Sequence, residues 1–403
     1  MLSRRAFLQS SAASVAFLAR GVSRARAGDA PGVTETEIRI GQTMPYSGPL
    51  SAYGVIGKTE AAYFAMINDL GGVNGRQLRL ISLDDEYNPA KTFELTRRLV
   101  EQERVAFIFS SLGTWTNGAI RPYLNMNEIP QLFVASGAEV FGDSERFPWT
   151  MGWQPSYQTE AAIFGKHMLA TKPDARIGVL FQDDRFGRDY MVGLKEGLGG
   201  KHSGMIVETA TYEYWDRTVE SQVESLCRAG ADTFLIAAVE EFAAQAIHKA
   251  FDIGWTPIRY VTGVSQSISS TMTAAGREKL KGAITAVYDK DPTDARWAGD
   301  AGFLQYSAFI KRYLSEGVKD DARVVHGFGG AATLVHVLKQ CGDDLSRKNI
   351  MSQAANINSL ELPMLLPGVK ISTSAGNYHP IRQMQLAAFN GASWELFGNL
   401  LGS

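Results

Sequence analysis

From residue 38 onward, short apolar runs rich in β-branched residues alternate with segments of helical periodicity. This rhythm predicts parallel sheets covered by helices, because neighbouring parallel strands need a crossover connection and a helix usually supplies it. The first series of predicted strands covers residues 38–43, 78–83, 105–109 and 131–134, with helices at 53–68, after Asn88-Pro89 and at 116–127. The rhythm therefore restricts this part of the chain to the α/β class.

The same rhythm starts again after Trp153. About 375 residues exceed what one hydrophobic core usually holds, so we expect two lobes, each built on a doubly wound parallel sheet. The second series has predicted strands at 177–181, 205–210, 233–237, 259–262 and 283–287, and predicted helices at 183–198, 219–229 and 242–251. Two further helices are expected around Phe303 and near 329–340, and a β-like tail follows Gly368.

Residues 1–27 have the pattern of an export signal. Arg4 and Arg5 precede a weakly apolar run, and Ala25-Arg26-Ala27 has the small residues of a cleavage site. The run holds about half of the ~20 apolar residues that a membrane-spanning helix needs, so we expect a cleaved signal and no anchor. Paired arginines are typical of twin-arginine signals, which predicts a periplasmic protein. An ordinary charged N-terminus is the alternative.

Composition and missing motifs exclude several classes of function. Without residues 1–27 the chain has 35 basic and 42 acidic residues, a net charge of −7, which argues against a nucleic-acid partner. There is no P-loop, no G-x-S-x-G elbow and no H-E-x-x-H helix, and the six histidines lack metal-ligand spacing. We therefore expect no enzyme activity, no catalytic residue, no metal and no cofactor.

Two smaller patterns are structural rather than functional. Gly327-Phe328-Gly329-Gly330 lacks the preceding strand of a dinucleotide-binding loop, and it predicts close helix packing instead. Cys227 and Cys341 lie far apart in apolar helical contexts, which predicts two separate buried thiols. An exported compartment would also permit a disulfide between them.

Three loops that follow predicted strands are rich in hydroxyl groups, glycine and aromatic rings. They cover residues 44–54, 110–117 and 135–139, and they meet at the carboxyl edge of the sheet, where α/β folds bind ligands. Thr114, Trp115 and Thr116 open a helix whose free N–H groups and dipole would hold a carboxylate. For a single loop, simple capping by the same hydroxyls is the alternative, but three such loops favour a binding site.

Aromatic residues fall in or near these loops and their counterparts in the second series. Tyr53 and Trp115 belong to the first series, and Tyr157 and Phe186 to the second. Their rings could form the walls around an apolar or aromatic ligand. Ordinary packing in the core or between the lobes is the alternative for some of them.

With these residues in view, the chain resembles the leucine/isoleucine/valine-binding type of periplasmic solute-binding protein, which serves ABC transporters. The resemblance extends from about residue 38 to residue 396. It is carried by Ile40-Gly41, Ser47-Gly48-Pro49 with Tyr53-Gly54, Gly71-Gly72-Val73-Asn74-Gly75-Arg76, Asp84-Asp85 with Asn88-Pro89, Ser136-Gly137-Ala138 and Phe186-Gly187. It implies a type I periplasmic binding fold, in which two lobes joined by three hinge strands close over a ligand.

The resemblance also implies roles for single residues. Thr114, beside Thr116, and Ser136, with the backbone of Ala138, would hold the ligand carboxylate. Tyr53 and Phe186 would flank the ligand from the two lobes, and Tyr157 would contact it just past the first hinge crossing. The implied lobes comprise residues 34–154 with 289–366, and residues 155–288 with 367–403.

The nature of the ligand stays open at this point. Amino-acid binders of this type place a second-lobe carboxylate against the ligand ammonium, but the matching segment, Val264-Ser265-Gln266, has no acid. Glu240 and Glu241 are the nearest candidates, and an ammonium buried without a partner is strongly disfavoured. We therefore expect a small carboxylate, either a branched-chain or apolar amino acid or an aromatic or apolar organic acid.

The implied function is the capture of that ligand for an ABC importer, with its membrane permease as the partner of a monomeric binding protein. A ligand sensor of the same fold, which signals to a receptor or regulator, is the alternative. An exported hydrolase is a third hypothesis, which the missing nucleophile and base disfavour.

Overall fold

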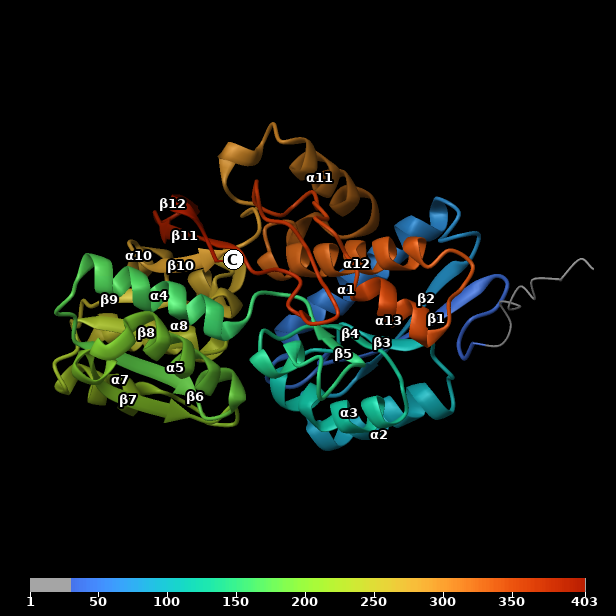
Figure 1. Cartoon of the computed structure of the whole chain (residues 1–403). Helices are drawn as coiled ribbons and strands as arrows, with labels where there is room; N and C mark the ends of the chain where they lie inside the picture. Colours follow the sequence, from blue (N-terminus) through green and yellow to red (C-terminus); the bar gives the residue numbers. More distant parts are fainter. Residues whose placement is uncertain (1–29, 403) are drawn as a thin grey trace, which may run out of the picture.

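Two α/β lobes lie side by side in the computed structural model, which describes residues 30–402 (Figure 1). The predicted export signal lies outside the described residues. The first lobe holds five parallel strands in the order β2-β1-β3-β4-β5. Their bounds are β1 (Glu37–Met44), β2 (Gln77–Asp84), β3 (Phe107–Phe109), β4 (Gln131–Val134) and β5 (Thr150–Gly152). The predicted alternation of strands and helices is confirmed here.

Helices from two separate stretches of the chain cover this sheet. They are α1 (Val55–Asp69), α2 (Pro89–Glu101) and α3 (Thr114–Met126), and later α11 (Ala301–Tyr313), α12 (Ala322–Gln340) and α13 (Arg347–Ala354). Helix α12 packs against α1. A Cβ atom at Gly327 would lie 2.9 Å from the Ile56 carbonyl oxygen, so only glycine permits this approach. The predicted close packing of the glycine-rich segment is therefore confirmed.

The second lobe holds seven strands in the order β12-β11-β10-β9-β8-β6-β7. Their bounds are β6 (Ile177–Gln182), β7 (Ile206–Tyr212), β8 (Thr233–Ala237), β9 (Ile258–Val261), β10 (Ile284–Val287), β11 (Met384–Phe389) and β12 (Trp394–Leu401). The helices are α4 (Tyr157–Thr171), α5 (Arg185–Leu198), α6 (His202–Met205), α7 (Glu220–Arg228), α8 (Glu240–Asp252), α9 (Thr273–Ala275) and α10 (Arg277–Leu280).

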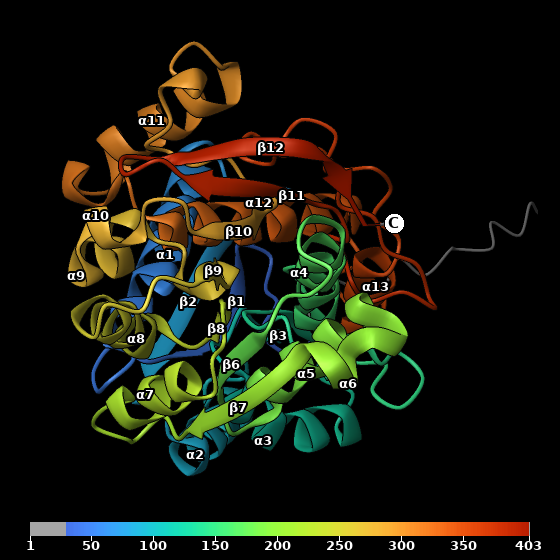
Figure 2. The same ribbon diagram turned by 90° about the vertical axis from the view of Figure 1, so that its left-hand side faces the viewer.

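One edge of this sheet departs from the expected parallel arrangement. Strands β11 and β12 form a hairpin that continues antiparallel from β10 (Figure 2). The remaining pairs are parallel. The strand–helix rhythm could not indicate this edge, because hairpin strands need no crossover helix.

The chain passes between the two lobes more than once. It leaves the first sheet at Gly152 and enters α4 at Tyr157, and it returns after β10 to form α11 and α12. Before β11 begins, Tyr378 donates a hydrogen bond to the Pro148 carbonyl, 3.2 Å away. The predicted residue boundaries of the lobes stay a prediction.

Two large aromatic side chains on helices lie at the surface. Phe251, near the end of α8, is 57% exposed, and the Lys279 ammonium lies 4.9 Å from its ring centre. Phe93 is 37% exposed and meets the Tyr123 ring edge-on at 5.7 Å. Neither ring belongs to a buried core cluster, and each contacts a basic or an aromatic neighbour at the surface.

Further features concern the cysteines and the membrane. Cys227 and Cys341 are free thiols, Cys341 buried and Cys227 half-buried. None of the helices in residues 30–402 is both long enough and apolar enough to cross a bilayer.

A buried acid in α1 makes the stability of the first lobe sensitive to pH. Burial raises the pKa of Glu60 to about 8, although hydrogen bonds from Ser110 and Gln42 lower it. The native state then keeps a proton that the unfolded chain loses above its ordinary pKa of 4.5, so stability falls as the pH rises from about 4.5 to 8. We expect Glu60→Gln to remove much of this decline, which amounts to ~1.4 kcal/mol per pH unit.

Denaturant unfolding at pH 5, 7 and 9 measures the effect. The Glu60→Gln variant should gain most over the natural protein at pH 9 and least at pH 5. The exposed Glu94 offers a matched control, and Glu94→Gln should leave the decline in place. Parallel pH profiles for Glu60→Gln and the natural protein would contradict the expectation.

Candidate functional site

A central cavity of about 110 Å³ lies between the lobes. This volume accommodates roughly seven to eleven water-sized groups at ~10–15 Å³ each, which suits a small ligand. Residues at or next to the N-termini of several helices line it: Tyr53 before α1, Thr114 of α3, Tyr157 of α4, Phe186 of α5, Glu240 of α8 and Arg323 of α12. The carboxyl edges of two α/β sheets thus face each other, and helix N-termini there favour a bound anion.

The start of α3 has the features of a carboxylate site. Its N-cap is Gly113, with φ +102°, and no side chain caps the first turn. Both Gly113 and Thr114 line the central cavity. The first N–H groups of a helix have no partner within it, so here they are free of side-chain competition. The alternative of simple capping by the loop hydroxyls does not describe this helix.

Behind Thr114 lies a short chain of hydroxyl groups. The side-chain oxygens of Thr114 and Ser136 share a hydrogen bond of 2.7 Å, and Ser136 Oγ accepts the Ala138 N–H at 3.2 Å. Ser136 and Ala138 are buried and do not line the central cavity. They contact Thr114 or each other, so they form its support.

Thr116 and Trp115 lie away from the central cavity. The Thr116 hydroxyl is buried and donates to the Leu112 carbonyl, one turn earlier in the chain. Trp115 is 45% exposed. Its ring lies 5.4 Å from Tyr214 and 6.1 Å from Trp215, both in the loop after β7 of the second lobe. Successive residues of a helix point in different directions, so these two cannot share the orientation of Thr114.

Aromatic rings form one wall of the central cavity. Tyr157 meets Phe186 edge-on at 5.0 Å and stacks on Tyr190 at 5.1 Å. From the first lobe, the Tyr53 hydroxyl donates to the Val264 carbonyl of the second lobe at 3.1 Å. Of the nine residues predicted for the site, Tyr53, Thr114, Tyr157, Phe186 and Glu240 line the central cavity.

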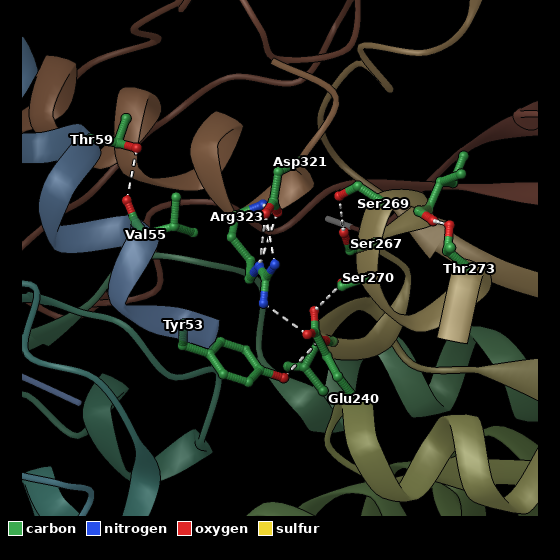
Figure 3. A network of polar contacts seen from close by, with 12 residues as sticks. Tyr53, Val55, Thr59, Glu240, Ser267, Ser269, Ser270, Thr273, Asp321 and Arg323 are labelled. Atoms are coloured by element: carbon green, nitrogen blue, oxygen red, sulfur yellow. Dashed lines mark hydrogen bonds and ion pairs between the residues drawn. The ribbon is translucent and has the colours of Figure 1, made fainter. Parts of the chain in front are cut away.

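An ion-pair cluster joins the lobes at the edge of the cavity (Figure 3). Arg323 Nη1 of α12 lies 2.8 Å from Glu240 Oε2 of α8, and Arg323 Nη2 lies 2.6 Å from Asp321 Oδ2. Glu240 also accepts from the Ser270 hydroxyl at 3.0 Å. Burial raises the pKa of Glu240 to about 7; Arg323 lowers it and Asp321 raises it. The Glu240 carboxylate is therefore held by the protein itself.

Sequence reasoning missed several ionisable residues that line the central cavity, among them Arg323, Glu160 and Asp289. Arg323 lies in a helix that follows no strand, so no strand-end pattern pointed to it. Glu160 accepts from the Tyr190 hydroxyl at 2.6 Å and the Gly263 N–H at 2.7 Å, and burial raises its pKa to about 7. Asp289 follows β10 directly, and its position at a strand end was a usable signal.

The arrangement suits binding. Within residues 30–402, no group of three or more His, Cys, Asp or Glu residues could hold a metal ion. The cavity combines an uncapped helix N-terminus, aromatic walls and acids fixed by hydrogen bonds, with contacts that cross from lobe to lobe.

Comparisons with known proteins agree with this geometry. A family profile described as "Periplasmic binding protein" matches residues 37–393. Leu/Ile/Val-binding protein homolog 1 of Brucella abortus (strain 2308) is 20% identical over 314 residues, 76% of this chain and 80% of that protein.

Two solved structures are similar over nearly their whole length. A branched chain amino acid ABC transporter protein from Thermus thermophilus with bound valine has a TM-score of 0.82 at 15% identity, covering 91% of this chain and 97% of that one. A solute binding protein from R. palustris in complex with 4-hydroxybenzoate has a TM-score of 0.77 at 14% identity, with the same two coverages, 91% and 97%. At these identities the structures establish the fold alone.

Proposed function

We propose that this protein captures a small carboxylate between its lobes for an ABC importer. The chain belongs to the periplasmic binding protein family, and the similar proteins of known structure are solute-binding proteins and not enzymes. The family implies a location outside the cytoplasm. Export by the twin-arginine route, a permease partner and a monomeric state complete the proposal.

The uncapped start of α3 at the central cavity is the observation that carries this proposal. Ser136 can donate its hydroxyl hydrogen to Thr114, since Ser136 Oγ already accepts the Ala138 N–H. The Thr114 hydroxyl is then free to donate to a ligand oxygen. Charge-assisted hydrogen bonds of this kind are the stronger ones, and the helix dipole adds to them.

The aromatic wall indicates the other part of the ligand. Tyr157 and Phe186 supply apolar surface from the second lobe, and Tyr53 from the first. We therefore propose a ligand with an apolar or aromatic body, either a branched-chain or apolar amino acid or an aromatic or apolar organic acid. Similar proteins with bound valine and with bound 4-hydroxybenzoate lend support to both classes.

Calorimetry with leucine, valine, benzoate and 4-hydroxybenzoate tests the proposal. We expect at least one of these acids to bind, and its primary amide to bind at least tenfold more weakly, because the amide group carries no negative charge for the helix N-terminus. The amides are matched controls of nearly equal size. Equal binding of acid and amide, or no binding by any acid, would contradict the proposed carboxylate site.

A further inference from the structure

Asp289 places a carboxylate in the wall of the central cavity, and no other residue between 30 and 402 is its partner. It is only 8% exposed, and it follows β10 at the point where the chain leaves the second sheet. Its own backbone N–H is the sole hydrogen-bond donor to this carboxyl group among the described residues. A buried carboxylate is normally paired; this one has no such compensation, and burial raises the pKa of Asp289 to about 7.

Lys290 is the next residue in the chain, and Arg323 and His326 line the same cavity, but none of them supplies a free positive charge to Asp289. Lys290 Nζ lies 2.5 Å from Asp300 Oδ1 and 2.8 Å from the Pro363 carbonyl. Arg323 is held by Asp321 and Glu240. Burial lowers the pKa of His326 to about 4, so its ring is neutral at physiological pH. None of these side chains is available to compensate Asp289.

Gln266 supplies a second unpaired acceptor in the same wall. Its side chain is 7% exposed, and Oε1 has no hydrogen-bond partner in residues 30–402. The Trp394 indole donates to its backbone carbonyl at 2.8 Å, which holds the residue in place. Gln266 and Asp289 both also line a smaller neighbouring cavity that Thr114 does not reach. Both residues therefore border the same two cavities, whereas Thr114 borders only the central one of the two.

We propose that the ligand carries a hydrogen-bond donor, a hydroxyl or an ammonium group, that Asp289 and Gln266 receive at a second polar position of the central cavity. This inference rests on the proposed function and narrows it. A carboxylate with a purely apolar body would leave both acceptors unpaired in the closed protein, and unpaired buried acceptors weaken binding. Amino acids and hydroxylated aromatic acids carry both a carboxylate for the start of α3 and a hydrogen-bond donor for Asp289 and Gln266. Plain fatty acids and benzoate carry only the carboxylate.

Two matched ligand pairs test this on the full exported protein by calorimetry. Leucine and 4-methylpentanoate differ by the ammonium group, and 4-hydroxybenzoate and benzoate differ by the hydroxyl group. We expect the donor-bearing member of at least one pair to bind at least tenfold more tightly. The pair that shows this preference identifies which donor the ligand carries.

Asp289→Asn then assigns the preference to this side chain. This variant has no carboxylate charge at position 289 but keeps an acceptor oxygen. The preference for leucine over 4-methylpentanoate should therefore fall at least tenfold, and the preference for 4-hydroxybenzoate over benzoate should fall less. Gln266→Met, similar in size but without the acceptor, should reduce either preference. Asp189→Asn is the control, because this buried acid accepts from the Gln158 side chain and the Glu139 N–H and does not line the central cavity.

Each result bears on the inference. Equal affinities within both pairs, or a preference that survives both Asp289→Asn and Gln266→Met, would overturn it while leaving the carboxylate site intact. Failure of every acid to bind would overturn the proposed function as well. Since Asp289 has no partner to lose, Asp289→Asn should fold with unchanged or higher thermal stability, and a clear loss of stability would also count against the inference.

Discussion

Replacement of Arg323 by methionine is expected to weaken ligand binding at least tenfold and to lower thermal stability. Arg323 lies between Glu240 of the second lobe and Asp321 of its own lobe, and all three side chains are largely buried. Removing one partner of a buried ion pair commonly costs ~3–5 kcal/mol, because the remaining charges lose their compensation. In this protein two carboxylates would be left facing each other across the lobe interface.

The loss should depend on pH in a defined direction. Arg323 lowers the pKa of Glu240, so its removal lets that pKa rise above its present value of about 7. Below that value Glu240 takes up a proton and the repulsion with Asp321 falls. We therefore expect the stability defect of Arg323→Met to be larger at pH 8 than at pH 6.

Thermal unfolding and calorimetry measure the two consequences, the loss of stability and the loss of affinity. The double variant Arg323→Met with Glu240→Gln should recover part of the loss, since the unpaired charge on Glu240 is gone. An Arg323→Met protein with natural stability and affinity would show that the ion pair does not join the lobes in solution.

Substitution of Thr114 by valine is expected to reduce the affinity for a bound carboxylate by about 30-fold, or ~2 kcal/mol, the usual contribution of a hydrogen bond to a charged group. Thr114 is the hydroxyl residue at the start of α3 that lines the central cavity. Ser136→Ala should cause a smaller loss, because Ser136 acts through its 2.7 Å hydrogen bond to Thr114. Calorimetry with an acid that binds the natural protein measures both effects.

Thr116→Val is the matched control for Thr114→Val. The two residues lie on the same helix and undergo the same change, but the Thr116 hydroxyl is occupied by the Leu112 carbonyl. Its loss should affect stability and leave affinity within about twofold of the natural value. If Thr116→Val weakened binding as much as Thr114→Val, the orientation of this helix turn relative to the ligand would be wrong.

Much of the fold was predictable from local sequence. The predicted strands 131–134 and 233–237 coincide with β4 and β8, because strands buried within parallel sheets are continuous apolar runs. The predicted N-terminus of α2 is also confirmed: Asn88 Oδ1 accepts from the N–H groups of Ala90 and Lys91, at 3.0 and 3.2 Å. Such features depend on residues a few positions apart, so they can be read from the chain directly.

The location of the site was predictable only to the level of loops. Loops 110–117 and 135–139 follow β3 and β4, and the rule that ligands bind at the carboxyl edge of a parallel sheet pointed to them. The choice between Thr114, Trp115 and Thr116 depends on how α3 is rotated about its axis. That rotation is set by packing against the rest of the lobe, which no short pattern in the sequence describes.

The amino-acid sequence by itself determined the class of fold, the positions of most strands along the chain and the loops that meet at the sheet edges, because these follow from short-range periodicity and from backbone hydrogen bonding. The tertiary structure alone decided that Glu240 meets Arg323, that Trp115 faces Tyr214 and that Asp289 and Gln266 share a wall. These contacts join residues of different lobes, and Trp115 and Tyr214 are 99 positions apart in the sequence. They depend on how the lobes face each other and how each side chain is turned, and both are properties of the assembled protein.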